Sequence, residues 1–355
     1  MGTQIRQAIA SDKAAWNLYV HSHSQATPYH DFSWVESVEE AYGHVNVSLI
    51  ALNNDKLVGI LPIVKMEHPF FGHSLCSLPF CDLGHALADN QEILNALLSQ
   101  LQHLKESCGA KYIEYRDTAR DMYRSTLDIT SDENKLEGKK VRMLLSLPET
   151  SDQLMSGFKS KLRSQIRKSD KNGLTYQVGN NPELINAFYQ VFIHNMRKLG
   201  SPVHSKSWYQ ALRKHYQDDL LVSIIYTQNI PIGAGIVLRN GTKACIPWAS
   251  TLAEFNHLAP NMLLYWSLLK EVTDSGAKAF DFGRSTYGEG TFNFKQQWGA
   301  EPLALNWSRL EQQESPSDEH ATPSKLRGMI EYGWSRLPLS MTTMIGPKIR
   351  KYISL

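Results

Sequence analysis

An internal duplication is the feature that most constrains the fold of this 355-residue chain. Short segments of the first half recur in the second half, in the same order and between 167 and 175 residues later. The matching pairs are His30-x-x-x-Trp34 with His204-x-x-x-Trp208, Val47–Ala51 with Val222–Tyr226, Gly59 with Gly233, Leu78-Pro79-Phe80 with Ile246-Pro247-Trp248, and Gly109-Ala110-Lys111 with Gly276-Ala277-Lys278. Five ordered matches at a nearly constant offset indicate two copies of one fold.

Each copy shows the same succession of local patterns. After the segment with the tryptophan, two β-rich runs flank a polar turn, at Asn53–Asp55 or Gln228–Asn229, and predict a hairpin. A third strand is expected to end near each x-Pro-aromatic triplet. A helix follows, then a last strand, and Gly109 or Gly276 is expected to close the helix. The apolar residues on these helices are Ile93, Leu97, Leu101 and Leu104 in the first copy and Met262, Leu263, Trp266 and Leu269 in the second.

This order of elements is that of an N-acetyltransferase-like (GNAT) fold. We therefore expect an α/β (α+β) protein with two tandem duplicated GNAT-like domains, each a mixed, largely antiparallel sheet flanked by helices. The predicted domains are residues 1–148 and 149–310, and the second opens with a basic helix. Residues 311–323 are polar, acidic and proline-containing and predict a linker, and residues 324–355 predict a helical tail.

Composition excludes several classes of function. The net charge of +2 gives no global basic field for nucleic acid. No apolar run approaches the roughly 20 residues of a membrane span, and residues 1–16 lack the core of a signal peptide. We therefore expect a cytoplasmic protein. Its four cysteines, Cys76, Cys81, Cys108 and Cys245, have no zinc or disulfide spacing, so we expect buried thiols and no metal.

Two stretches of the second half carry chemistry-bearing residues. Phe280–Gly299, FDFGRSTYGEGTFNFKQQWG, predicts a strand that ends at Gly283, a glycine-punctuated loop, and an aromatic run with Lys295. Ligands of open α/β sheets gather beyond the carboxyl ends of strands. Residues 150–173 predict one long helix with Phe158, Leu162 and Ile166 on an apolar stripe. A basic stripe, Lys159, Arg163 and Arg167, lies beside it.

The sequence resembles the Fem-type (FemAB) aminoacyltransferases, and more narrowly their branch associated with PEP-CTERM/exosortase and exopolysaccharide loci. The similarity is carried by KLRSQIRKSDKNGL, APNMLLYWSLL, FDFGRS…FNFKQQWGAEP and the tail WSRLPLSMTTMIGPKI. It implies two acetyltransferase-like domains and amide-bond formation on an amine of a cell-envelope precursor. In better-understood members the donor is an aminoacyl-tRNA and the acceptor a peptidoglycan precursor.

Three residues near the strand end are predicted to be catalytic. Lys295 corresponds to the lysine of the family's Phe-Lys motif, and the resemblance implies that it lies at the reacting centre, where a fixed cation stabilises an oxyanion. The alternative is a surface lysine in an amphipathic turn. Asp281 is expected to orient or deprotonate the amine, and Arg284 to hold a carboxylate or phosphate. Alternatively, Asp281 and Arg284 pair with each other and only fix the loop.

Six further residues are predicted to bind substrate. Lys161, Arg163 and Arg167 are expected to bind phosphates of a nucleotide-linked or lipid-linked substrate or of tRNA, although a basic C-terminal half also suits the helix dipole. His204 is a candidate substrate contact, but its duplication as His30 favours packing. Trp248 and Tyr265 are candidates for lining an acceptor pocket, and core packing is their alternative.

The donor stays open between aminoacyl-tRNA and acyl-CoA, and no further cofactor is required. The segment Ala249–Asn261 has no glycine, which counts against the pyrophosphate-binding turn of coenzyme-A acetyltransferases. We expect an acyltransferase that acts on an envelope or exopolysaccharide precursor. The alternatives are an acyl-CoA-dependent N-acetyltransferase and a non-catalytic binding module in polysaccharide assembly. The tail either packs on the body or contacts the inner face of the membrane peripherally.

Overall fold

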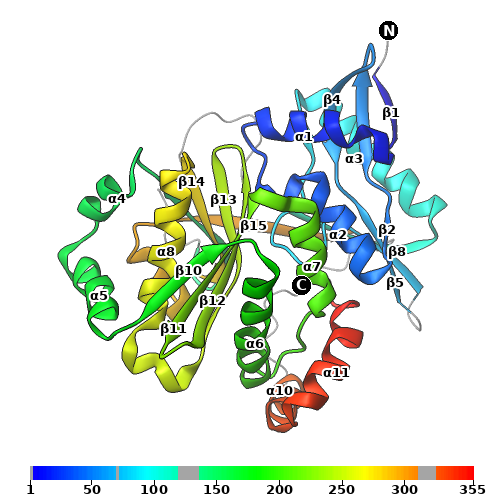
Figure 1. The fold of residues 1–355 in the computed structure, drawn as a ribbon. Coiled ribbons are helices and arrows are strands. Elements are labelled where there is room, and N and C mark those ends of the chain that lie inside the picture. The colour runs from blue at the N-terminus through cyan, green and yellow to red at the C-terminus, as the bar shows by residue number, and fades with distance from the viewer. Residues whose placement is uncertain (1–2, 69–71, 119–135, 311–324) are drawn as a thin grey trace. The chain divides into compact units, whose positions relative to one another are not determined.

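The computed structural model describes residues 3–68, 72–118, 136–310 and 325–355. They form two compact units, and neither unit is continuous in sequence (Figure 1). Of the described residues, unit 1 holds those up to Leu136, those from Leu303 to 310, and Tyr352–Leu355; unit 2 holds the others. The predicted boundary at 148/149 thus falls after a strand of unit 2, and the predicted second domain includes residues 303–310 of unit 1. Most of the predicted linker lies outside the described residues.

Unit 1 has two sheets. One has the strand order β1-β3-β4-β7, and the other has the order β15-β8-β6-β5-β2, in which only β6 and β8 are parallel. Helix α3 packs its apolar face on β3, β4 and β8. The elements are β1 (Gln4–Gln7), α1 (Lys13–Ser22), α2 (Phe32–Tyr42), β2 (Val45–Asn46), β3 (Leu49–Asn53), β4 (Lys56–Leu61), β5 (Val64–His68), β6 (Gly72–Cys76), β7 (Leu87–Ala88), α3 (Gln91–Ser107), β8 (Ala110–Thr118) and β15 (Glu301–Leu310).

Unit 2 has one sheet with the order β10-β11-β12-β13-β14-β9, in which only β13 and β14 are parallel. Gly235 of β12 faces Leu264 and Leu268 of α8, whereas Trp248 of β13 contacts α7 on the opposite face. The elements are β9 (Lys140–Ser146), α4 (Ser151–Gly157), α5 (Ser160–Lys171), β10 (Thr175–Gly179), α6 (Pro182–Lys198), α7 (Lys206–Tyr216), β11 (Leu220–Thr227), β12 (Ile230–Asn240), β13 (Lys243–Thr251), α8 (Pro260–Asp274), β14 (Ala279–Thr286), α9 (Gly290–Gln296), α10 (Lys325–Arg336) and α11 (Leu339–Arg350).

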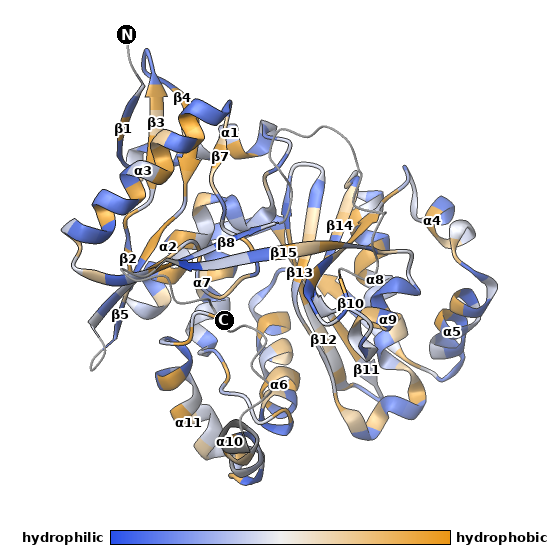
Figure 2. Cartoon of the chain, turned by 180° about the vertical axis from the view of Figure 1, so that it is seen from behind, coloured by the Kyte–Doolittle hydropathy of each residue, from blue (hydrophilic) through white to orange (hydrophobic). Residues whose placement is uncertain are grey.

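The hairpins confirm the duplication at the level of strand register. Ala51 pairs with Gly59 in unit 1, and Ile225 pairs with Gly233 in unit 2; a register shift follows Ala51 and Ile225 alike. Both turns hold two consecutive residues at positive φ, at Asn54–Asp55 and Gln228–Asn229, as a tight hairpin turn requires. The two hairpins are therefore copies of one structure. Figure 2 shows the hydrophobic residues along the strands of the first hairpin, β3 and β4.

The helices that follow the hairpins also agree with the prediction. The four apolar residues predicted on α3 are at most 5% exposed, and Leu263 and Leu269 of α8 are equally buried. Gly109 and Gly276 follow the two helices at φ of +60° and +92°. This left-handed conformation ends a helix at low steric cost only for glycine. The duplication extends beyond the predicted matches, because β1 pairs with β3 as β10 pairs with β11.

Two predicted element boundaries are wrong. Strand β13 does not end at the Ile246-Pro247-Trp248 triplet but continues to Thr251, because Pro247 lies at a register shift where the ladder needs no donor. The predicted long helix is two helices, α4 and α5. Phe158 between them has an extended backbone, which directs its buried ring onto Trp266 and Trp298. The predicted N-cap, Thr150, does accept a hydrogen bond from the amide of Gln153.

The two helices of the predicted tail pack on α6. The Arg197 guanidinium at the end of α6 donates to the Leu337 carbonyl oxygen at 2.7 Å, between α10 and α11. The backbones approach closely at Gly200 and Gly346, where a side chain would collide with Glu331 and crowd Val203. Over the ranges that the structure describes, no helix combines the length and the apolar character that crossing a membrane requires.

Candidate functional site

The centre of the predicted site is a bulge in β14. The pairing with β9 gains one residue between Asp281 and Arg284, and Gly283 within it has a φ of +73°. The Asp281 Oδ1 atom accepts a hydrogen bond from the Gly283 amide at 2.8 Å, which closes a tight turn. The strand therefore continues past Gly283 to Thr286, and the predicted strand end is a bulge instead. Bulges of this kind re-aim side chains and backbone groups near functional sites.

Lys295 of α9 is hydrogen-bonded to the backbone of the bulge. Its Nζ donates to the carbonyl oxygens of Gly283 and Arg284 at 3.0 and 2.8 Å, and its side chain is 8% exposed. The alternative of a solvated surface lysine is thus inconsistent with the structure. Because an ammonium on two carbonyls is fixed in position, the structure places a preorganised cation at the bulge.

Asp281 forms an ion pair with Arg142 of β9, 139 residues away. The alternative prediction, in which Asp281 pairs with Arg284 and only fixes the loop, is therefore wrong. The Asp281 Oδ2 accepts a hydrogen bond from the Arg142 Nε at 2.9 Å, and the Arg142 Nη2 lies 2.7 Å from the same oxygen. Both carboxylate oxygens therefore accept hydrogen bonds. Sequence reasoning missed Arg142, and no local pattern around VRMLL marks it.

Lys243, on β13, is a second basic residue that the sequence did not single out. It opens the short parallel pairing in which Cys245 lies opposite Asp281. Burial, with a smaller contribution from the charge of Arg142, lowers the pKa of Lys243 to about 8. A lysine with a pKa this low is partly neutral near physiological pH, and in that form it can accept a proton.

Strands β13 and β14 separate directly after Cys245 and Asp281, two residues beyond Lys243. Their pairing covers only Lys243–Cys245 and Ala279–Asp281. Beyond it, β13 continues with β12 as far as Thr251, while β14 continues with β9 as far as Thr286. The Asp281 carboxylate, the bulge and the Lys295 ammonium thus lie where two parallel strands open, and backbone groups there are released from the sheet ladder.

Tyr265 belongs to an aromatic cluster beside this opening. Its ring stacks on Phe282 with centroids 5.6 Å apart and meets Phe294 edge-on at 5.0 Å. Trp298 and Phe158 extend the cluster. Burial raises the pKa of the Tyr265 phenol well above its ordinary value, so the group stays neutral. The tyrosine is mainly a core residue, as its alternative predicted, and its neighbours flank Gly283 and Lys295 in the chain.

His204 and Trp248 lie together in a different aromatic cluster. The His204 imidazole stacks on Trp208 and contacts Trp248, with centroids 5.7 and 6.4 Å apart, and Trp248 packs against Tyr209. Burial, helped by the charge of Arg350, lowers the pKa of His204 well below its ordinary value. A neutral, buried imidazole among aromatic rings fits the packing alternative.

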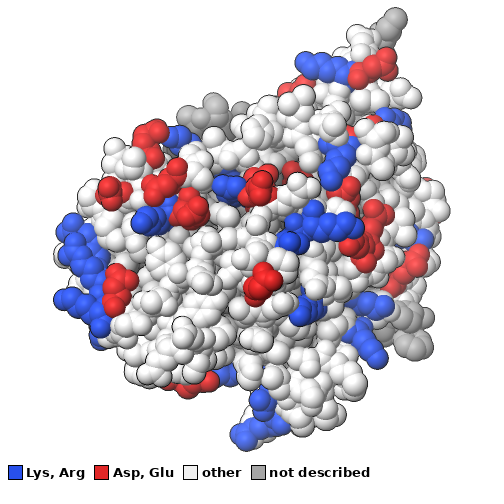
Figure 3. Space-filling view, in the orientation of Figure 1, with Lys and Arg blue, Asp and Glu red and all other residues white. Residues whose placement is uncertain are grey.

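The predicted basic residues lie on α5, which packs on α8 through Leu162 and Ile166. Lys161 and Arg167 are exposed, and Arg163 is half-buried. Figure 3 shows lysine and arginine side chains gathered over α5 at the left edge of the view. This helix presents an accessible positive face, and it is an element separate from the β14 bulge.

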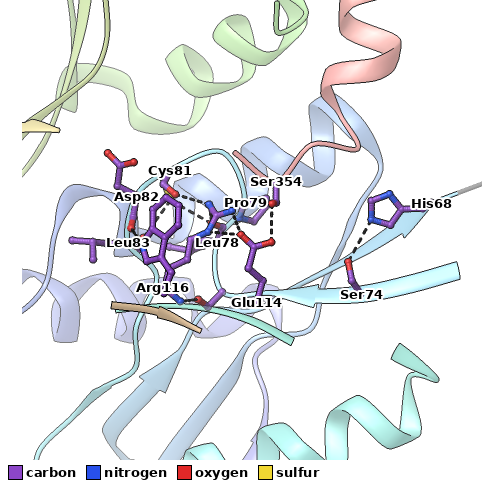
Figure 4. Close-up of polar contacts among 12 residues, drawn as sticks. His68, Ser74, Leu78, Pro79, Cys81, Asp82, Leu83, Glu114, Arg116 and Ser354 are labelled. Atoms are coloured by element: carbon purple, nitrogen blue, oxygen red, sulfur yellow. Dashed lines mark hydrogen bonds and ion pairs between the residues drawn. The ribbon is translucent and has the colours of Figure 1, made fainter. Parts of the chain in front are cut away.

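Unit 1 has a carboxylate at the position equivalent to Asp281, but its ion pair is built differently. Glu114 lies opposite Cys76 in the parallel β6–β8 pair, as Asp281 lies opposite Cys245. Glu114 pairs with Arg116, which is fully buried and also donates to the Leu78 and Cys81 carbonyl oxygens (Figure 4). The Arg116 guanidinium covers the Trp307 ring. In unit 1 the arginine thus comes from the same strand as the carboxylate and also donates to carbonyl groups beyond β6, whereas in unit 2 Arg142 comes from the neighbouring strand.

A metal site is not found: the described residues contain no group of three or more His, Cys, Asp or Glu side chains placed to hold an ion. Three of the four cysteines are buried, and Cys108 is half-buried.

Comparison with known proteins supports the fold. The profile of the acetyltransferase (GNAT) domain family matches residues 156–296. No curated protein has a significant match to this sequence. Among solved structures, FemX is 15% identical with a TM-score of 0.66, over 86% of this chain and 95% of that chain. L-PGS from Bacillus licheniformis is 10% identical with a TM-score of 0.55, over 99% and 98% of the two chains.

A tandem GNAT protein from the clavulanic acid biosynthesis pathway is 11% identical with a TM-score of 0.53, over 88% of this chain and 100% of that chain. These likenesses cover both units, and the family profile falls on the unit with the β14 bulge. The chain thus has the tandem GNAT fold of the Fem-like proteins.

Proposed function

We propose that this protein is a Fem-like acyl- or aminoacyltransferase that forms an amide on an amine of a cell-envelope or exopolysaccharide precursor. The observation that carries the proposal is the fixed Lys295 ammonium at the opening between β13 and β14. The family profile on residues 156–296 and the likeness to FemX support acyl transfer as the reaction class. A structure described as a putative lysylphosphatidylglycerol synthetase domain, from Agrobacterium fabrum, has the same fold at a TM-score of 0.52.

In the proposed reaction the acceptor amine attacks the acyl carbonyl carbon, the bond from that carbon to the donor breaks, and an amide forms. Negative charge develops on the carbonyl oxygen in the tetrahedral intermediate. A fixed cation stabilises this charge more strongly than water would, because the site is buried and the cation need not reorient. Lys295 would supply this cation.

The amine must also lose a proton, and we propose Lys243 over Asp281 as its acceptor. Both oxygens of Asp281 already accept hydrogen bonds, from Arg142 and from the Gly283 amide. Asp281 therefore fits a positioning role that fixes the bulge and the arginine. Lys243 has a pKa of about 8, close to the value that general-base catalysis needs.

Acidic groups of the substrates would be held by Arg284 at the bulge and by Arg163, Arg167 and Lys161 on α5. The exposed positive face of α5 suits phosphates, whether of a nucleotide-linked precursor, a lipid-linked precursor or a tRNA donor. Tyr265, and His204 with Trp248, would support the site through their packing in aromatic clusters and not through contact with the substrate.

The proposal is tested by measuring amino-acid transfer by the full-length protein. Total tRNA charged with radiolabelled amino acids is the donor, and amino-sugar and peptide precursors of the envelope are the acceptors. Lys295→Ala is expected to lower the rate about 10²- to 10³-fold, as loss of one oxyanion-stabilising group does. Lys295→Arg is expected to recover part of it.

The matched control is Lys278→Ala, since Lys278 is an exposed lysine paired with Glu149 in the same unit. It is expected to keep the wild-type rate. Thermal unfolding of each variant separates loss of chemistry from loss of fold. Wild-type turnover by a folded Lys295→Ala protein would refute the proposed role.

A coenzyme-A-dependent N-acetyltransferase is the second candidate, favoured by the GNAT domain profile. The start of α8 argues against it. This helix begins with Pro260, which has no amide hydrogen, after Ala259 in a left-handed conformation, so one backbone donor for a pyrophosphate is lost. Isothermal titration with acetyl-CoA distinguishes the two candidates: saturable binding supports the acetyltransferase, and no heat of binding supports the Fem-like reaction.

A further inference from the structure

Exposed apolar side chains concentrate on the two C-terminal helices. Thirteen large hydrophobic side chains are exposed among the described residues, and seven of them lie between Met329 and Ile353. This segment is less than a tenth of the chain. Single exposed apolar side chains are ordinary, but a concentration of them marks a surface that binds something.

Five of these seven side chains lie toward one side of α10 or α11, and Ile349 and Ile353 are not among them. On α10, Met329, Tyr332 and Arg336 follow each other at i, i+3 and i+7, and Ile330 flanks them. On α11, Met341, Met344 and Lys348 have the same spacing. We call the five apolar residues, with Arg336 and Lys348, the outer face. Met329, Tyr332 and Met344 are 70%, 64% and 61% exposed, and Figure 2 shows hydrophobic and hydrophilic residues alternating along α11.

The opposite sides of both helices are already used for packing. Thr342 and Gly346 of α11 are buried, and Gly346 approaches the Val203 backbone so closely that a Cβ atom would lie 3.1 Å from its amide nitrogen. On α10, the Glu331 backbone covers Gly200. These inner sides anchor the helices on α6. The packing of the two helices therefore does not account for the apolar residues of the outer face.

The charge of this segment is strongly one-sided. From Lys325 to Leu355 the sequence has six lysines and arginines and one acidic residue, Glu331. Two of the bases, Arg336 and Lys348, belong to the outer face, and the Arg336 guanidinium lies 5.0 Å from the centre of the Tyr332 ring. Glu331 is not one of the outer-face residues, and its backbone lies against Gly200. The outer face is thus apolar and basic, without an acidic side chain.

This combination fits the interface of an anionic lipid bilayer. Methionine and isoleucine insert at the boundary of the acyl chains, and tyrosine prefers the headgroup level. Lysine and arginine extend their apolar stems while their charges reach lipid phosphates. Each helix has 12 residues and is therefore about 18 Å long, too short to span a hydrocarbon core of about 30 Å.

We propose that the outer face of α10 and α11 docks this protein on the surface of a membrane that contains anionic lipids, with both helices lying in the interface. The inference stands independently of the proposed transferase activity, because it concerns a surface of α10 and α11 and not the β14 bulge.

Vesicle co-sedimentation of the full-length protein tests this surface directly. Vesicles of phosphatidylcholine alone are compared with vesicles of phosphatidylcholine mixed with phosphatidylglycerol. The protein is expected to bind the mixed vesicles, to bind the neutral ones much more weakly, and to lose affinity as salt is raised. Absence of binding to the mixed vesicles would overturn the proposal and point to a protein partner for the outer face. Equal binding to both kinds of vesicle would overturn the requirement for anionic lipids.

Variants then locate the contact. The triple change Met329→Ser, Ile330→Ser and Met344→Ser is expected to weaken binding at least about tenfold, because the apolar area is lost. Arg336→Ser and Lys348→Ser are expected to weaken it about fivefold each, which corresponds to about 1 kcal/mol per basic residue.

The matched control is Leu18→Ser with Ile230→Ser, two hydrophobic residues that are 73% and 52% exposed elsewhere on the chain. It is expected to bind vesicles like the wild type. Thermal unfolding must be unchanged in all variants used. An unaltered affinity of the triple variant, or an equal loss in the control, would exclude the outer face as the contact.

Discussion

The two copies of the fold have a carboxylate at the same position, but they pair it with arginines from different strands. In unit 1, Glu114 is joined to an arginine two residues further along its own strand, and this Arg116 is fully buried. In unit 2, Asp281 is joined to Arg142 on the neighbouring strand, and Gly283 takes the place of a side chain. The first arrangement fills the opening between the parallel strands, and the second leaves a bulge whose carbonyls hold a lysine.

The difference shows how a duplicated fold can separate structural and chemical roles. The loss of a buried arginine that several groups depend on is strongly destabilising, and its hydrogen bonds leave no group for a substrate. A bulge with a fixed ammonium contributes less packing but keeps charge at the opening. We therefore expect changes in unit 1 to affect stability and the matching changes in unit 2 to affect turnover.

The largest effect on stability is expected for Arg116→Met. It leaves Glu114 without its partner and two carbonyl oxygens without a donor, so the free energy of unfolding should fall by about 3–5 kcal/mol. Urea denaturation measures this. The control, Arg309→Met, removes an arginine that covers the Tyr112 ring, and it should change stability by about 1 kcal/mol at most. A loss below 1 kcal/mol in Arg116→Met would contradict the structural role of this pair.

Asp281→Asn is expected to lower turnover on the order of 10²-fold, because Arg142 loses its ion-pair partner and the bulge shifts. Glu114→Gln should leave the turnover of folded protein unchanged. If Asp281 positions the bulge, the pH profile of the variant keeps its shape. A changed pH profile in this variant would contradict the positioning role.

A smaller effect is expected for Gly283→Ala. A φ of +73° is unfavourable for any residue with a Cβ atom by about 1–2 kcal/mol, so thermal stability and turnover should both decrease. Gly157→Ala, at a glycine with open space around it and no positive φ, is the control and should be neutral. Equal behaviour of the two variants would show that the bulge geometry is not required.

The smallest effect is expected from the titration of Lys243. Its pKa is lowered from 10.5 to about 8, so the unfolded chain binds more protons than the folded one between these values. Stability should therefore rise with pH from about 8 to about 10.5, relative to Lys243→Met, by about 1 kcal/mol after allowance for partial exposure. Parallel stability curves of wild type and variant across this range would contradict the lowered pKa.

Much of the fold follows from local sequence. The polar turns at Asn54–Asp55 and Gln228–Asn229 require positive φ, and the glycines after α3 and α8 close their helices, so hairpins and helix ends are readable from short segments. The break at Phe158 was not readable, because its cause is the packing of one ring on Trp266 and Trp298, more than 100 residues away.

The candidate site was readable only in part. Lys295 and Asp281 stand out in Phe280–Gly299, but their partners do not. The Asp281–Arg142 ion pair joins residues 139 positions apart, and no pattern around Arg142 marks it. The role of Gly283 as a bulge, and not a strand end, depends on the register between β14 and β9, which a single sequence does not reveal.

The interleaved course of the two units has a consequence for synthesis on the ribosome. Strand β15, which pairs with β8 and supplies Trp307 to Arg116 and Asp82, is made only after all strands of unit 2. The sheet of unit 2 therefore has its complete set of strands first, although unit 1 begins the chain. During translation, unit 1 cannot complete its sheet until the strands of unit 2 have emerged, because β8 lacks β15 as its partner.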